Sequence, residues 1–351
     1  MNNHDNAIAH CCAECGKEGG VSLKMCKSCL ETKYCDAKCQ KNHWLNHKAA
    51  CKLRAAKIRD VALFKDDPPP KEDCPICFLP MPTYIISCAS LPPATILSVP
   101  INDFAEANEA LALEPMASLP PATVSSVPIY DFAIANEALK GKATEEYYPC
   151  CGKSFCKGCV YSFLESGNDK CPFCNSEQRE GKTLEERVQK MMRRVAANDA
   201  ASICVLADSY YNGSAGFQQD HMKAMELFTK SAELGCSKAH GRLGDIYYEG
   251  GYLKKAKFHL EAAAMAGNEV ARYNLGNMEY NFGNMERAAK HWIIAASAGE
   301  YDAMHEMRTF FEKGLVSRES IDSTLAAYNN SCKEMRSEAR DAYIQFETDT
   351  I

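Results

Sequence analysis

Cysteine and histidine residues offer the clearest chemistry in this sequence. The chain has 351 residues and 20 cysteines, and 17 of these cysteines lie within residues 1–174. Many come in pairs with two or three residues between them. Such a turn presents two thiolates together, and zinc prefers four sulfur or nitrogen ligands in a tetrahedron. The uneven distribution therefore predicts zinc sites rather than ordinary buried cysteines.

The first group of candidate ligands lies within residues 12–51 and forms four pairs. These ligands are Cys12, Cys15, Cys26, Cys29, Cys35, Cys39, His47 and Cys51. Eight ligands suffice for two tetrahedral sites. The last two pairs are each four residues apart, a spacing that puts both side chains on one face of a helical turn. The alternatives, chance clustering or a redox thiol pair, do not account for eight ligands in order.

Residues 12–51 resemble a MYND-type zinc finger over their whole length, including the aromatic Tyr34 before the fifth ligand. The resemblance implies interleaved pairs and two zinc ions. One ion would be held by Cys12, Cys15, Cys35 and Cys39, and the other by Cys26, Cys29, His47 and Cys51. It also implies a module that binds proteins or proline-containing peptides.

A second group of cysteines follows between residues 74 and 174. Its members are Cys74, Cys77, Cys150, Cys151, Cys156, Cys159, Cys171 and Cys174. The segments CPIC, CCGKSFCKGC and CPFC resemble a divergent RING-type zinc finger. The resemblance implies a cross-brace with two further zinc ions. Cys74, Cys77, Cys156 and Cys159 would hold one, and Cys150, Cys151, Cys171 and Cys174 the other.

This second finger departs from the RING pattern at one ligand. The position usually taken by histidine is Lys153, and a protonated lysine cannot bind zinc. The adjacent Cys150 is our candidate replacement, which would make an all-cysteine variant. A three-ligand site completed by water is the alternative.

The other departure is an insert at residues 83–149, where a short loop is usual. Residues 89–111 match residues 117–139 at 19 of 23 positions. Each copy is predicted to be an extended stretch followed by a short helix, with Asp103 or Asp131 as its N-cap. The insert is interpreted as a tolerated surface insertion, with a dedicated binding loop as the alternative.

The RING resemblance leaves two functions open. A RING-type ubiquitin ligase has no catalytic residue of its own and works by bringing a ubiquitin-conjugating enzyme close to its substrate. The predicted contacts for that enzyme are Ile76 and Pro172, with Tyr161 and Phe163 as further apolar candidates. Asn175 stands where a basic residue is frequent, which favours the alternative of a non-catalytic zinc-finger scaffold.

Residues 184–346 contain a helical repeat. The segments LADSYYNG, LGDIYYEG and LGNMEYNFG align, and Gly235, Gly267 and Gly299 end successive units 32 residues apart. The pattern resembles Sel-one-like repeats, relatives of the tetratricopeptide repeat, which form a solenoid that binds proteins or peptides. We expect the leucines and the tyrosines at 211, 248 and 280 to fill the core between helices.

The predicted fold is therefore multidomain, with two small zinc-stapled modules followed by an all-α helical-repeat solenoid. Its expected parts are a finger at 12–51, a linker at 52–73, a second finger at 74–174, a linker at 175–183 and the repeats at 184–346. With a net charge of −6 and no long apolar run, neither nucleic acid nor a membrane is expected as a partner. The absence of a signal-like N-terminus and the metal-type cysteine spacing predict a cytoplasmic or nuclear protein.

Overall fold

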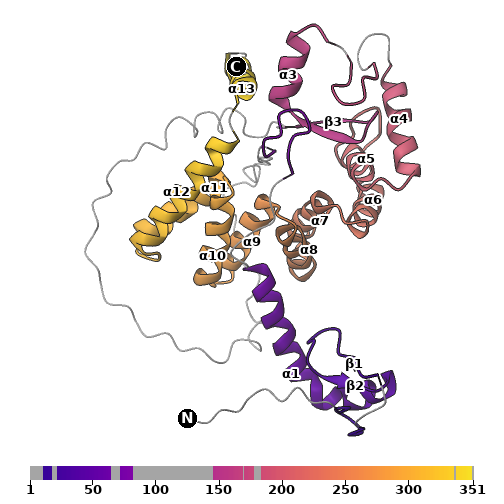
Figure 1. The fold of residues 1–351 in the computed structure, drawn as a ribbon, viewed down its shortest axis with the longest axis vertical. Helices are drawn as coiled ribbons and strands as arrows, with labels where there is room; N and C mark the ends of the chain where they lie inside the picture. Colours follow the sequence, from indigo (N-terminus) through magenta and orange to yellow (C-terminus); the bar gives the residue numbers. More distant parts are fainter. Residues whose placement is uncertain are drawn as a thin grey trace. The chain divides into compact units, whose positions relative to one another are not determined.

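The computed structural model describes residues 11–17, 22–64, 72–81, 145–168, 170–177, 183–335 and 337–349. The chain divides into two compact units, which meet in sequence between Asp67 and Pro68. Both copies of the duplicated insert, with their predicted short helices, lie outside the described residues. The predicted architecture of zinc-finger modules followed by an all-α solenoid is confirmed (Figure 1).

The first unit is built on a short hairpin and one long helix. Strands β1 (Lys24–Met25) and β2 (Lys33–Tyr34) pair antiparallel, and helix α1 follows (Ala37–Leu63). The Asp36 carboxylate accepts a hydrogen bond from the Cys39 backbone N–H at 2.8 Å and caps α1. The core consists of Tyr34 and the buried cysteines of the finger.

Helix α1 extends well into the segment predicted to be a linker. It continues from the last candidate ligand, Cys51, to Leu63, and the Phe64 N–H bonds the carbonyl of Asp60. This stretch is rich in Ala, Lys, Arg and Leu and has no Gly or Pro before Pro68, so nothing in it stops a helix. Only the part after Leu63 remains a candidate linker.

The second unit begins with the second cysteine-rich finger. Strands β3 (Glu145–Tyr148) and β4 (Lys153–Cys156) form an antiparallel hairpin, and helix α3 (Lys157–Glu165) follows directly. Phe155 is fully buried between the cysteines, and its ring meets that of Tyr148 edge-on with centroids 5.0 Å apart. The hairpin thus supplies the small apolar core of this finger.

The helical repeats follow in the same unit. The Thr183 hydroxyl accepts a hydrogen bond from the Glu186 N–H and caps α4 (Leu184–Ala196). Antiparallel helices then succeed one another, each packing on the next. They are α5 (Ala200–Asn212), α6 (His221–Glu233), α7 (Ser237–Glu249), α8 (Leu253–Met265), α9 (Glu269–Asn281), α10 (Met285–Ser297), α11 (Tyr301–Glu312) and α12 (Arg318–Glu334).

Glycines make this repeat possible at two kinds of position. Gly235, Gly267 and Gly299 follow the ends of α6, α8 and α10 with φ of 90°, 89° and 87°, a conformation that favours glycine as a helix stop. Gly276 of α9 lies directly under the indole of Trp292, so even a methyl group there would collide with it. The repeat spacing therefore reflects both helix ends and close helix packing.

The tyrosine stripe does not fill the core as predicted. Leu243 and Leu275 are fully buried, whereas Tyr211 and Tyr248 are only half-buried and Tyr280 is 38% exposed. The tyrosines end their helices, where the ring can lie along the surface with its hydroxyl in water. Asn281 donates a hydrogen bond to the Tyr248 hydroxyl at 3.1 Å, which links successive repeats on this face.

The last helix, α13 (Glu338–Asp349), leaves the solenoid. Helix α12 packs on the repeats, against α10 and α11. Helix α13 packs instead on α3 of the second finger (Figure 1). The finger is thus held by the C-terminal end of the chain.

Candidate metal centres

The structure gathers the sixteen predicted ligands into four groups. Each group contains four side chains whose ligand atoms lie within 4.8 Å of one another. The groups are Cys12, Cys15, Cys35 and Cys39; Cys26, Cys29, His47 and Cys51; Cys74, Cys77, Cys156 and Cys159; and Cys150, Cys151, Cys171 and Cys174. This grouping matches the interleaved and cross-braced pairings expected from the two resemblances.

The spacing of the sulfur atoms fits zinc and excludes disulfides. Tetrahedral Zn–S bonds of about 2.3 Å place ligand sulfurs roughly 3.8 Å apart, whereas a disulfide needs about 2.05 Å. The Sγ atoms of Cys15 and Cys35 lie 3.7 Å apart, and those of Cys26 and Cys51 lie 3.6 Å apart. In the second finger, Cys151 and Cys171 are 3.7 Å apart. The donor sets and their spacing are those of bound zinc.

The same backbone turn presents ligands at four places. After the first cysteine of each pair, the N–H of the fourth residue along bonds that cysteine's carbonyl at 2.9 Å. This fourth residue has a positive φ every time: Gly16 (67°), Leu30 (51°), Phe78 (54°) and Asn175 (56°). Only one of the four is glycine, so the turn is imposed on Leu30 and Phe78, whose side chains disfavour it.

Helix α1 contributes ligands to both groups of the first finger. Cys39 lies in its first turn, and its Sγ is 3.4 Å from that of Cys35. His47 and Cys51 lie one turn apart further along the helix and are both buried. One helix therefore ties the two sites together.

Thr32 supports the ligands of the buried site from behind. Its Oγ1 is hydrogen-bonded to Nδ1 of His47 at 3.3 Å and lies 3.9 Å from the Sγ of Cys29. That bond fixes the imidazole so that Nε2, 3.4 Å from the same sulfur, faces the ligand group. Burial, with the nearby His43, lowers the pKa of His47, so the ring is in the neutral form that binds metal. Burial also raises the pKa of Tyr34 to about 12.

The first site of the second finger joins two distant segments. Cys74 and Cys77 lie in a turn before the insert, and Cys156 and Cys159 lie at the start of α3. Cys77 and Cys156 have their Sγ atoms 4.0 Å apart. The β3–β4 hairpin and α3 thus bring Cys156 and Cys159 to the turn that carries Cys74 and Cys77, which lies far from them in sequence.

Cys150 lies in the last group, where we expected it to replace the missing histidine. The turn that joins β3 to β4 makes this possible, because Gly152 adopts φ of 70° and lets two adjacent cysteines face the same point. Lys153 points elsewhere, with its Nζ 4.5 Å from the ring centre of Phe173. Burial opposes ionisation of Cys174, but its hydrogen bonds with Ser176 outweigh this and lower its pKa to about 7.

Two arginines of the helical region support the second finger, and neither could be identified from the sequence alone. Arg194 of α4 donates to the Pro149 carbonyl at 3.2 Å, pairs with Asp199 at 2.6 Å and lies against Gly152. It therefore braces the turn that carries Cys150 and Cys151. Arg340 of α13 contacts the other site. Neither residue belongs to a motif, because both reach the finger only through the tertiary fold.

The predicted partner contacts on the second finger are placed differently from one another. Ile76 packs on the finger's core and is half-buried, and Pro172 is also half-buried. Tyr161 faces α13, with its ring centroid 5.1 Å from that of Phe346 and 6.1 Å from that of Tyr343. Part of the predicted surface is thus occupied by the chain's own last helix.

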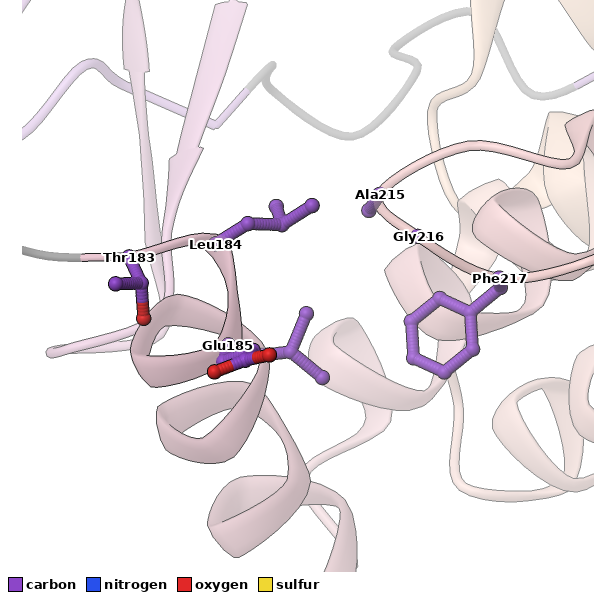
Figure 2. Close-up of a pocket in the computed structure, with 7 residues that line it drawn as sticks. Thr183, Leu184, Glu185, Ala215, Gly216 and Phe217 are labelled. Carbon is purple, nitrogen blue, oxygen red and sulfur yellow. The ribbon is translucent and has the colours of Figure 1, made fainter.

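An open pocket of about 440 Å³ lies where α4 begins (Figure 2). Leu184 and Val188 of α4 face Phe217 and the backbone of Ala215 and Gly216 across it. Glu185 is the one ionisable residue in its lining. The pocket offers a mainly apolar surface and no constellation of groups for catalysis.

The described residues contain no helix long and apolar enough to span a membrane.

The family model of the MYND finger matches residues 12–51, so this part of the chain is a MYND-type zinc finger. Among solved structures, the chain is similar to a Sel1 repeat protein from Oxalobacter formigenes. The two are 22% identical with a TM-score of 0.38, over 50% of this chain and 69% of that one. It is also similar to a protective antigen of uropathogenic Escherichia coli with an SLR fold. This second similarity has 20% identity and a TM-score of 0.36, over 54% of this chain and 44% of the antigen. A MYND-type finger combined with a helical-repeat solenoid is the make-up of a protein-interaction scaffold.

Proposed function

We propose that the chain is an adaptor-type ubiquitin ligase. In this proposal the second finger recruits a ubiquitin-conjugating enzyme, and the MYND finger and the repeats bind the protein to be modified. The finger would contribute proximity and orientation rather than a nucleophile. All sixteen ligands would hold zinc, with two ions in each finger.

One observation carries the proposal. The second finger has two complete four-cysteine groups in the cross-braced order, although its usual histidine is missing. Such closed sites have no open coordination position for chemistry and serve to hold a surface in shape. Ile76 and Pro172, the predicted contacts, each lie within one of the two metal-binding turns that the groups hold.

The test is autoubiquitination of the full-length, zinc-loaded chain with a panel of conjugating enzymes. We expect Ile76→Ala to reduce the rate at least tenfold while leaving the bound zinc unchanged. Leu53→Ala, which truncates an exposed side chain on α1, is the matched control and should keep full activity. Absence of activity with every enzyme, both in the full-length chain and in a chain lacking residues 337–351, would reject the ligase.

A non-catalytic scaffold is the second candidate, and a specific observation favours it. Tyr161 packs against Tyr343 and Phe346 of α13, so this predicted contact is not open to a partner. In addition, Asn175 adopts a positive φ in the metal-binding turn where a basic residue is frequent. A chain lacking residues 337–351 separates the two functions. Activity that appears only after this truncation would support a ligase restrained by α13, and none in either form would support the scaffold.

A further inference from the structure

Arg340 is a buried cation whose guanidinium faces the second finger. It is 5% exposed although it belongs to the last helix of the chain. Its Nε lies 3.3 Å from the Sγ of Cys156, and its Nη2 lies 3.5 Å from the Sγ of Cys77. One arginine thus contacts a sulfur from each half of the same four-cysteine group, 184 and 263 residues away in sequence.

The remaining donors of this guanidinium bind backbone carbonyls around the same site. Nη1 donates to Pro80 at 2.9 Å and to Met335 at 2.5 Å, and Nη2 donates to Leu79 at 3.4 Å. Leu79 and Pro80 close the turn that carries Cys74 and Cys77. Arg340, near the start of α13, therefore connects the metal-binding turn, the start of α3 and the end of α12.

The packing of α13 leaves little freedom around this contact. Gly158 of α3 lies so close that an added Cβ would come within 2.6 Å of the Arg340 Cα. Further along, Tyr343 and Phe346 lie beside Tyr161. The backbones of α3 and α13 meet at a glycine, and the arginine side chain enters the finger at that point.

The charge of a metal-loaded site explains why a cation is placed there. Zinc holds cysteines as thiolates, so a four-cysteine site carries a formal charge of about −2. A buried charge needs an oppositely charged or hydrogen-bonding partner. The N–H groups of a guanidinium supply both, and charge-assisted hydrogen bonds are the strong ones. Without the metal, the buried Arg340 would lose this anionic partner.

We propose that Arg340 is an outer-shell residue of the metal site formed by Cys74, Cys77, Cys156 and Cys159, and that metal binding at this site docks helix α13 on the finger. Linkage makes the effect reciprocal: a docked α13 slows loss of the metal by the same coupling through which the metal holds α13. The C-terminal helix is then a metal-dependent clasp.

The first experiment measures metal release at each site separately. The full-length, zinc-loaded chain is exposed to a chelator and a thiol-alkylating reagent, and each cysteine's labelling rate is read by peptide mass spectrometry. Outer-shell changes cost roughly 10–100-fold in metal affinity. We expect Arg340→Met to speed labelling of Cys77 and Cys156 by about that factor, with labelling of the MYND finger unchanged. The control, Arg318→Met, removes an exposed arginine paired with Asp322 and should change nothing.

The second experiment measures the docking of α13 on the finger by amide hydrogen exchange. Cys77→Ser should expose the amides of α13, whereas Cys15→Ser, at a site in the other unit, should not. Arg340→Lys keeps the charge but loses the paired geometry, and it should give a smaller increase in labelling than Arg340→Met. If Arg340→Met does not fold, Arg340→Lys carries the test. An unchanged labelling rate at Cys77 and Cys156, or an α13 that stays protected in Cys77→Ser, would overturn the proposal.

Discussion

The two fingers use the same ligand chemistry but draw their support from different parts of the chain. In the first finger, Thr32 backs His47 and Asp36 caps the helix that carries Cys39. All these groups come from within the finger. In the second, Arg194 and Arg340 belong to helices of the second unit that lie beyond the finger in sequence. The first finger is self-contained, whereas the second is completed by the helical region.

This difference in support indicates which parts of the structure depend on zinc in each finger. Helix α1 has 27 residues, of which only His47, Cys51 and Leu63 are buried, so it has little packing apart from its ligands. The second finger is also tied to the repeats directly. The Tyr147 hydroxyl lies 2.5 Å from that of Ser202, and Lys238 pairs with Glu145. Metal should therefore be a folding requirement for both fingers, and in the second it should also hold helix α13 in place.

Chelation of all zinc should have the largest effect, and it tests how far the loss of structure extends in each unit. Structural zinc contributes on the order of 10 kcal/mol per site in small modules, and a mostly exposed helix is marginal alone. We expect residues 22–64 to lose all protection from amide exchange. In the second unit, loss should be confined to residues 72–81, 145–177 and α13, with α7–α10 still protected. Exchange throughout α7–α10 would contradict the separation.

Substitution of Cys150 tests the least usual ligand. We expect Cys150→Ser to lower the bound zinc by one ion per chain, as measured by native mass spectrometry. Cys11→Ser is the matched control, because Cys11 is also next to a ligand but belongs to none of the four groups. It should leave the zinc content unchanged. An unchanged content in Cys150→Ser would favour the water-completed site instead.

Removal of one supporting side chain from each finger tests whether only the second finger is coupled to the repeats. Thr32→Val and Arg194→Met should each cost roughly tenfold in zinc retention at the site they back. Only Arg194→Met should also lower the thermal stability of the repeats, because Arg194 pairs with Asp199, which caps α5. Cysteine labelling and a melting curve measure the two effects. Equal melting shifts in both variants would show that the fingers do not differ in this way.

The shared metal-binding turn should respond alike in both fingers. Leu30 and Phe78 hold a left-handed conformation that costs a non-glycine residue roughly 1–2 kcal/mol. Leu30→Gly and Phe78→Gly relieve this strain but free the unfolded chain. We expect each to stabilise its finger by up to about 1 kcal/mol, measured by denaturant unfolding of the zinc-loaded chain. A loss of stability would mean that the side chain contributes more than its backbone strain costs.

Acid provides the smallest expected effect and acts on the repeats as well as on His47. Burial, reinforced by the charge of Arg272, lowers the pKa of His291 in α10 to about 3. The neutral ring stabilises the fold above the unfolded pKa of about 6.5, and this contribution is lost as pH falls toward 3. Between pH 7 and 6 the loss is about 0.7 kcal/mol. His291→Gln should flatten this part of the pH dependence in urea unfolding, and an unchanged slope would exclude His291.

The ligands could be predicted from the sequence because their information is local. The spacing of Cys12 and Cys15, or of Cys171 and Cys174, indicates a metal-binding turn. The pairing of these turns into groups is implied by the resemblance to known zinc fingers. Even Cys150 could be predicted as a ligand, because Lys153 stands at the usual histidine position and cannot bind zinc. The helix stops at Gly235, Gly267 and Gly299 are local in the same sense.

What could not be predicted depends on contacts between distant segments. Arg340 is one of many arginines until the fold brings it to Cys77 and Cys156. Tyr280 has the residue type of a core position, but its place at the end of a helix leaves it partly exposed. The extension of α1 past Cys51 was missed because the metal-binding motif ends before the helix does.

Because Cys77 and Cys156 belong to the same four-cysteine group, the length of the chain between them can vary. There are 72 residues between Cys77 and Cys150, and the cost of closing a loop grows only with the logarithm of its length. Deleting 28 residues, the offset between the start of one copy at residue 89 and the next at residue 117, would change that cost by about 0.4 kcal/mol. Metal binding at the junction thus makes this point of the chain a permissive site, where whole segments can be gained, duplicated or replaced with little effect on the finger that encloses them.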